Sequence, residues 1–136
     1  MITAVDTTVL LDVLGPDPLF GARSAQALRD AIAQGSLIAC EVVWAEVGGR
    51  FAQGGDATRV LERLTVAYSA IHATEALEAG RAWQTYRARG GTRERVIADF
   101  LVGAHATARA DRLLTRDRGF FRTYFEDLTV VDPGSD

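Results

Sequence analysis

Four acidic residues are the feature of this sequence that could do chemistry. They stand where the surrounding pattern does not call for a charge: Asp6, Glu46, Asp99 and Asp117. Carboxylates that lie close together repel one another at neutral pH, so a protein keeps such a group where something neutralises it. Oxygen-only ligands suit Mg²⁺ or Mn²⁺, which bind one or two carboxylates together with substrate phosphate. If the four acids meet, the chemistry indicated is metal-assisted hydrolysis of a phosphodiester bond.

The elements that carry the acids predict that they can meet. Asp6 follows the apolar run 2–5, which has the character of a short buried strand, and Asp117 comes two residues after a second such run. Glu46 and Asp99 lie within the first two turns of predicted helices. Parallel strands end at one edge of a sheet, and that edge is where open α/β sheets bind ligands. All four carboxylates are therefore expected at one rim.

Each acid taken alone also has an ordinary explanation, and the sequence leaves these explanations open. Asp6 and Asp117 could cap the helices that follow them, and Asp99 could be an early-turn carboxylate that meets the helix dipole. Glu46 could pair with Arg50, one helical turn further on.

Strands and helices alternate along the rest of the chain. Predicted strands are 2–5, 37–40, 66–71, 113–115 and 128–131, and predicted helices or turns are 9–14, 18–34, 41–51, 56–64, 74–89, 97–110 and 117–121. Thr7 and Thr8 are expected to cap the first helix, and Asp17 with Pro18 to start the second. The positions expected to face the core include Leu28, Ile32, Leu77, Trp83, Tyr86, Ile97, Phe100, Leu101, Ala104 and Ala108. This alternation predicts a three-layer α/β domain with a mainly parallel sheet and helices on both faces.

Composition predicts one soluble domain spanning residues 1–136. The chain is 48% hydrophobic and 24% charged, with no apolar run of membrane-spanning length and no signal-peptide pattern at its start. The one cysteine, Cys40, lies in an apolar run and cannot form an internal disulfide. A cytoplasmic location is expected. His72 and His105 lack the partners and spacing of a zinc site.

The basic residues are all arginine, and they are concentrated in one segment. Nine of the 15 lie between positions 87 and 122 with only four acids, which gives that segment a charge of +5 in a chain of net charge −3. Arginine suits phosphate recognition, so the segment suggests a polyanionic partner. The candidates for holding RNA backbone flank the acid motifs: Arg93, Arg95, Arg116 and Arg118. Pairing of these arginines with surface acids is the alternative.

Three stretches, together with Glu46, carry a family resemblance that covers essentially the whole chain in order and spacing. They are Ala-Val-Asp-Thr-Thr-Val-Leu-Leu (4–11), Arg-Val-Ile-Ala-Asp-Phe-Leu-Val-Gly-Ala-His-Ala (95–106) and Leu-Leu-Thr-Arg-Asp-Arg-Gly-Phe (113–120). These motifs resemble PIN-domain ribonucleases, in particular the VapC toxins of bacterial toxin–antitoxin pairs. None of the family's acids is replaced. Glycine at Gly103, inside a predicted helix, has no explanation from the sequence.

The resemblance implies roles for particular residues. The family's metal-site acids carry over onto Asp6, Glu46, Asp99 and Asp117, and its supporting hydroxyls onto Thr8 and Thr115. It further implies a three-layer α/β/α PIN-like domain with a five-stranded parallel sheet, dependence on Mg²⁺ or Mn²⁺, cleavage of RNA, homodimers, and inhibition by a small antitoxin. An arginine-bearing antitoxin segment is expected in a groove beside the acids, with apolar walls formed by Leu10, Leu14, Trp44 and Phe51.

Two rival enzyme classes do not match. A haloacid-type phosphatase needs a second aspartate two residues after the first, where this chain has Thr8, and a receiver domain needs a lysine, which the chain lacks. A catalytically silent domain that binds RNA or a protein partner through the same arginines remains the alternative. The four intact acids disfavour it, because a pure binder of polyanions would gain from losing them.

Overall fold

The computed structural model describes residues 1–15, 17–92 and 95–134. At its centre is a sheet of five strands in the order β3-β2-β1-β4-β5, and every pairing is parallel. The strands are β1 (Ile2–Val5), β2 (Ser36–Ala39), β3 (Val66–Tyr68), β4 (Arg112–Leu114) and β5 (Val130–Val131). The predicted five-stranded parallel sheet is confirmed.

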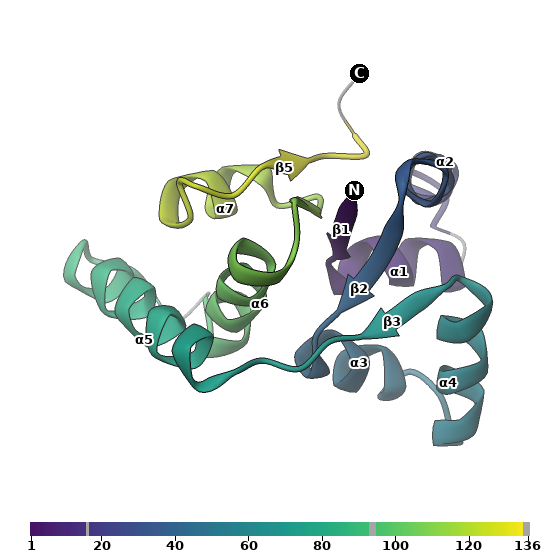
Figure 1. Ribbon diagram of the computed structural model, residues 1–136, viewed down its shortest axis with the longest axis horizontal. Helices are drawn as coiled ribbons and strands as arrows, with labels where there is room; N and C mark the ends of the chain where they lie inside the picture. Colours follow the sequence, from purple (N-terminus) through teal and green to yellow (C-terminus); the bar gives the residue numbers. More distant parts are fainter. Residues whose placement is uncertain (16, 93–94, 135–136) are drawn as a thin grey trace.

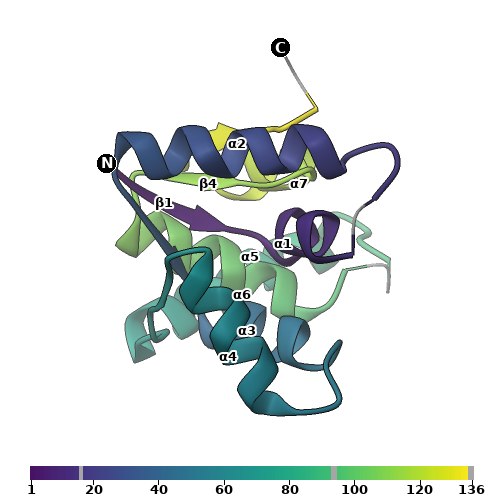
Figure 2. The same cartoon turned by 90° about the vertical axis from the view of Figure 1, so that its right-hand side faces the viewer.

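Helices lie on both faces of this sheet. They are α1 (Thr7–Leu14), α2 (Gly21–Gln34), α3 (Glu41–Gly48), α4 (Gly54–Arg63), α5 (Ala73–Ala88), α6 (Ile97–Arg109) and α7 (Arg118–Tyr124). Helix α2 runs along one face and α6 along the other (Figure 2), and α5 packs against α6 on the outside (Figure 1). The three-layer α/β/α arrangement is therefore confirmed. In the described part of the chain, no helix combines the length and apolar character that crossing a membrane requires.

The burial and pairing of the central strand, β1, determine where the residues that follow it lie. The last residues of β1 are almost completely buried, because β2 and β4 flank the strand and helices cover it. In β4, Leu113 and Leu114 are equally buried, and Val5 is in register with Leu114. The close-packed apolar residues of these two neighbouring strands therefore end at the same height in the sheet. The residues that follow, Asp6 and Thr115, must lie side by side.

Several predicted boundaries were wrong, and side chains explain two of them. Thr7 and Thr8 do not cap α1, because Asp6 itself is the N-cap. Helix α2 begins at Gly21 rather than Pro18, since the Asp17 carboxylate accepts hydrogen bonds from the amides of residues 19 and 20 and holds a separate turn. Helix α3 ends at 48 instead of 51, and β3 at 68 instead of 71.

Some positions predicted to face the core are exposed. Leu77 is 71% exposed, Ile32 and Ile97 are about two-fifths exposed, and Ala108 also faces solvent. On α6 the predicted Phe100 and Ala104 are buried, and so are the other residues of the run 102–106. The reason is that α6 lies between the sheet and α5, so a wider arc of its surface is covered than a helix with one buried face would show.

Gly103 has a clear packing role on this buried arc. A Cβ at Gly103 would overlap Cε2 of Phe125, which follows α7. The Phe125 ring also contacts Phe100 and Phe121 in an aromatic cluster that joins α6 to α7. Glycine is therefore needed so that the ring can approach the α6 backbone.

Candidate active site

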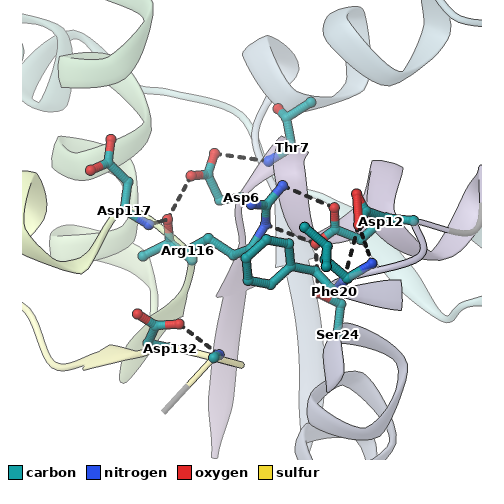
Figure 3. A network of polar contacts seen from close by, with 12 residues as sticks. Asp6, Thr7, Asp12, Phe20, Ser24, Arg116, Asp117 and Asp132 are labelled. Carbon is teal, nitrogen blue, oxygen red and sulfur yellow. Dashed lines mark hydrogen bonds and ion pairs between the residues drawn. The ribbon is translucent and has the colours of Figure 1, made fainter. Parts of the chain in front are cut away.

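Asp6 is the point at which the candidate site is assembled. Its backbone amide continues the sheet by donating to the Leu114 carbonyl, 3.0 Å away. Its carboxylate accepts the amide of Thr7 at 2.8 Å through Oδ1, and the hydroxyl of Thr115 at 2.7 Å through Oδ2 (Figure 3). Asp6 is therefore a helix cap, as its ordinary explanation held, and it also lies at the rim where the functional prediction placed it.

Thr115 connects Asp6 to Asp117. The Thr115 side chain is completely buried directly after β4. Its hydroxyl donates to Asp6 and accepts the backbone amide of Asp117 at 3.0 Å. One hydroxyl thus fixes the positions of two predicted site acids that are 111 residues apart in the sequence. The role of Thr115 as a supporting hydroxyl of a metal site stays a prediction.

Glu46 joins the same group through a threonine that the sequence analysis assigned only to a helix cap. The Oγ1 hydroxyl of Thr7 donates to Oε1 of Glu46 at 2.9 Å, and Thr7 is buried where α1 packs against α3. Thr8, the predicted supporting hydroxyl, is exposed, and its hydroxyl makes no hydrogen bond within the described residues. Thr7 faces Glu46 and Thr8 faces solvent because of the way α1 is rotated about its axis. The sequence around the two threonines does not indicate that rotation. Thr8 stays a prediction.

Asp99 lies in the first turn of α6, where its Oδ2 accepts the amide of Val96 at 3.3 Å. The pKa of Asp6 is raised from 3.8 to about 6, mainly by burial. The hydrogen bonds from Thr115 and Thr7 oppose this rise, and the negative charges of Asp99 and Glu46 add to it. The carboxylate of Asp6 is therefore repelled by two of the other three predicted acids.

The carboxylate of Asp117 is paired with an arginine. Its Oδ2 forms an ion pair and hydrogen bond with Nη1 of Arg95. The Arg95 guanidinium lies over the Phe120 ring, 4.3 Å from its centroid. The Arg95–Asp117 pair is half-exposed, so its contribution to stability is modest, at most about 1 kcal/mol. A stronger electrostatic partner of Asp117 could displace Arg95 at low cost.

The donor chemistry of the four acids fits a hard divalent cation, although the side chains do not converge on one. Within residues 1–15, 17–92 and 95–134, no three His, Cys, Asp or Glu side chains come together closely enough to hold a metal ion. The acids offer only carboxylate oxygens, and the charges of Asp99 and Glu46 raise the pKa of Asp6, a repulsion that a cation would relieve. Binding one ion with all four would therefore require these side chains to move closer together.

Neither histidine belongs to this site. His105 is buried, and its Nε2 lies 2.9 Å from the Ser69 hydroxyl. Burial lowers the pKa of His105, which favours its neutral form. His72 caps α5, and its Nδ1 lies 2.6 Å from Nη2 of Arg109.

The four arginines predicted to hold RNA differ in their surroundings. Arg95 is paired with the partly exposed Asp117, as the alternative interpretation held. Arg116 is instead paired with a buried carboxylate, that of Asp12. Arg118, at the start of α7, has no carboxylate partner among the described residues. Arg93 lies outside the described residues.

The predicted apolar groove is wrong at one position. Leu10 is completely buried in the core and cannot line a groove. Leu14, Trp44 and Phe51 are half-buried against the core, and Trp44 meets the ring of Tyr68 edge-on. These three remain candidates for contact with a partner.

Comparison with protein-family models identifies the family of this chain. The family model of the PIN domain matches residues 3–126, a range that includes all four acids. The chain belongs to the PIN-domain family. The predicted family is therefore confirmed. A comparison with curated protein sequences gives no significant match.

Solved structures share the fold of this PIN domain. A chain of VapBC2 from Rickettsia felis, bound to a DNA fragment from its promoter, has a TM-score of 0.75 at 16% identity, over 97% of this chain and 98% of that one. VapBC-1 from nontypeable Haemophilus influenzae gives 0.75 at 19% identity, over 99% and 100%. Mycobacterium tuberculosis VapC20, described as a sarcin–ricin loop cleaving toxin, gives 0.53 at 14% identity, over 82% and 86%. At these identities the similarity is one of fold.

Proposed function

We propose that this PIN domain is a metal-dependent endoribonuclease that hydrolyses RNA phosphodiester bonds, and that it acts as the toxin of a toxin–antitoxin pair. The observation that carries the proposal is the group of carboxylates around Asp6. Glu46 and Asp99 add to the burial of Asp6 in raising its pKa to about 6, and Thr115 ties Asp6 to the backbone of Asp117. A protein with no use for a cation would gain stability by losing one of these charges.

Each residue then has a definite task. Asp6, Glu46, Asp99 and Asp117 would hold Mg²⁺ or Mn²⁺. When bound, such an ion lowers the pKa of a coordinated water and stabilises charge on phosphate oxygens. Thr115 orients Asp6, and Thr7 orients Glu46, each by donating a hydroxyl hydrogen bond to the carboxylate. Such supporting hydrogen bonds fix the direction of a ligand oxygen. Arg118, which has no carboxylate partner in the described part of the chain, is available to contact RNA phosphate.

The toxin role rests on the solved structures with this fold. A structure from Klebsiella pneumoniae with a TM-score of 0.70 at 20% identity is described as a toxin–antitoxin complex, and VapC20 is described as a sarcin–ricin loop cleaving toxin. We extend two features to this chain: RNA as the substrate and a cognate small antitoxin as the inhibitor. A cytoplasmic homodimer is part of the same proposal. The acidic rim would attract an arginine of the antitoxin, beside the half-buried Leu14, Trp44 and Phe51.

A catalytically silent binding domain is the second candidate, and the Arg95–Asp117 pair favours it, because it neutralises one site acid without a metal. The test uses end-labelled RNA with the wild-type protein in Mg²⁺, Mn²⁺ or EDTA. An Asp99→Asn variant removes a site acid. Its matched control is Asp56→Asn, which changes an exposed aspartate of α4. Metal-dependent cleavage that disappears in EDTA and in Asp99→Asn, and persists in the control, supports the nuclease. RNA binding without cleavage in either metal supports the silent domain.

A further inference from the structure

Arg116 lies between Thr115 and Asp117 in sequence, but its side chain is directed toward α1 and α2 (Figure 3). Its Nη2 donates to Oδ1 of Asp12 at 3.0 Å. Its Nε lies 2.9 Å from Oδ2 of the same carboxylate, although the N–H is not aimed well enough to count as a hydrogen bond. The guanidinium also lies over the Phe20 ring, 4.1 Å from the ring centroid.

Asp12 is an acid that the sequence analysis did not single out. It lies within α1, in the apolar run from Val9 to Leu14, and is only 4% exposed. Its Oδ2 also accepts the hydroxyl of Ser24, a completely buried residue of α2, at 2.7 Å. A buried carboxylate is stable only when it is paired and hydrogen-bonded. Arg116 and Ser24 meet that need, so the guanidinium is engaged by Asp12, while 29% of the Arg116 side chain stays exposed.

This contact joins two of the four segments that carry site acids. Asp6 is the N-cap of α1, and Asp12 follows it on the same helix. Thr115 and Asp117 flank Arg116 on the connection between β4 and α7. The two segments therefore meet twice: at the rim through the Thr115 hydroxyl, and further along α1 through Arg116. Because the two contacts are separated along α1, together they prevent the 115–117 segment from rotating about either contact.

We propose that Asp12 and Arg116 are positioning residues of the nuclease site, which together hold the 115–117 segment against α1 so that Asp6 and Asp117 keep their relative orientation. The inference rests on the proposed function. It replaces the prediction that Arg116 holds RNA backbone, because the arginine's charge is neutralised by Asp12 and its face is covered by Phe20.

The two roles of Arg116 predict opposite results for one substitution. Asp12→Asn removes the buried charge but leaves the arginine positive. If Arg116 contacts RNA, releasing it should leave RNA affinity unchanged or increase it, without slowing cleavage. If Arg116 positions the acids, Asp12→Asn should slow cleavage as Arg116→Ala does, while affinity stays the same. The experiment therefore compares these variants with an Asp12→Asn/Arg116→Ala double variant and with Arg116→Lys.

The measurements are the single-turnover cleavage rate constant at saturating protein and the RNA dissociation constant over a series of salt concentrations. We expect each single variant to lose about 10- to 100-fold in rate, as a misplacement of roughly 1 Å produces. Affinity and salt slope should stay at the wild-type values. The double variant should be no slower than the slower single variant. Arg116→Lys should not restore the rate, because lysine lacks the planar fork. Arg59→Ala, in an exposed arginine–aspartate pair on α4, is the matched control.

A second readout does not depend on cleavage. The Asp117 amide donates to Thr115, so hydrogen exchange at this amide in the metal-free protein reports how firmly the segment is held. Exchange should be faster in Asp12→Asn and Arg116→Ala, and unchanged in Arg59→Ala. If these variants do not fold, Ser24→Ala provides a milder change, since it removes one hydrogen bond to Asp12 and should shift both readouts in the same direction.

Weaker RNA binding with a salt slope reduced by about one phosphate contact, together with an unchanged saturated rate, would overturn the proposal in favour of an RNA contact. Additive losses in the double variant, or unchanged exchange at Asp117, would also overturn it. If the wild-type protein cleaves no RNA in either metal, the proposed function fails, while the exchange experiment still decides whether Asp12 and Arg116 hold the segment.

Discussion

The raised pKa of Asp6 predicts that Asp6→Asn makes the metal-free protein more stable at neutral pH. The folded protein binds this proton with a pKa of about 6, against an ordinary value of 3.8. Because the folded state holds the proton more tightly than the unfolded chain, an ionised Asp6 destabilises the fold. The destabilisation is absent below about pH 4, grows between pH 4 and 6, and is complete above pH 6.

The size of the effect follows from the structure. A shift of about two pKa units corresponds to about 3 kcal/mol of unfolding free energy. Asparagine has one carbonyl oxygen where Asp6 uses two carboxylate oxygens, so one hydrogen bond, to Thr7 or to Thr115, is lost. That loss costs about 1 kcal/mol, and the partial exposure of Asp6 reduces the gain further. The net stabilisation is about 1–2 kcal/mol, or roughly 3–8 °C in melting temperature.

Urea unfolding in EDTA at pH 7.5 and pH 4.5 measures this directly for the wild type, Asp6→Asn and the exposed control Asp56→Asn. The advantage of Asp6→Asn should be present at pH 7.5 and be lost or reversed at pH 4.5, where the wild-type carboxyl is mostly protonated. Added Mg²⁺ should stabilise the wild type more than the variant, by binding linkage. An Asp6→Asn protein that is less stable than the wild type at pH 7.5 in EDTA would refute the reasoning, as would an advantage that does not change with pH.

Three further variants test other parts of the account. Gly103→Ala should lower the unfolding free energy by about 1–3 kcal/mol, because its methyl group would overlap the Phe125 ring, and thermal melting checks this. Arg118→Ala should weaken RNA binding and lower the salt slope by about 0.7–0.9, without changing the saturated cleavage rate, as binding titrations over a salt series would reveal. Thr7→Val should weaken Mn²⁺ binding by about 10-fold or more, measured by calorimetry, because it removes the hydroxyl that orients the α3 carboxylate.

The fold was predictable because its signals are local and repeated. Apolar runs alternating with amphipathic segments require a parallel sheet between helices, and that requirement places the residues after β1 and β4 at one rim. The alternation of elements alone is therefore enough to expect Asp6 and Asp117 at the same edge of the sheet. The motifs around Asp99 and Asp117 then indicated the PIN family, which the family comparison confirms.

What the sequence did not reveal depends on contacts between distant segments. Gly103 is explained only by its contact with the ring of Phe125, a residue that follows α7. The pairing of Arg116 with Asp12 could not be predicted, because the two residues are 104 positions apart in the sequence. The exposure of Leu77 similarly depends on which side of α5 meets α6, and helical periodicity alone does not give that side.

The central claim is that the four carboxylates form one divalent-cation site, and Mn²⁺ binding tests it most directly. Titration followed by electron paramagnetic resonance would compare the wild type with Asp6→Asn, Glu46→Gln, Asp99→Asn and Asp117→Asn, and with the control Asp56→Asn. We predict that all four site variants bind Mn²⁺ more weakly, including Asp117→Asn, whose aspartate is paired with Arg95. The control should bind like the wild type. Unchanged Mn²⁺ affinity in the four site variants would contradict the account.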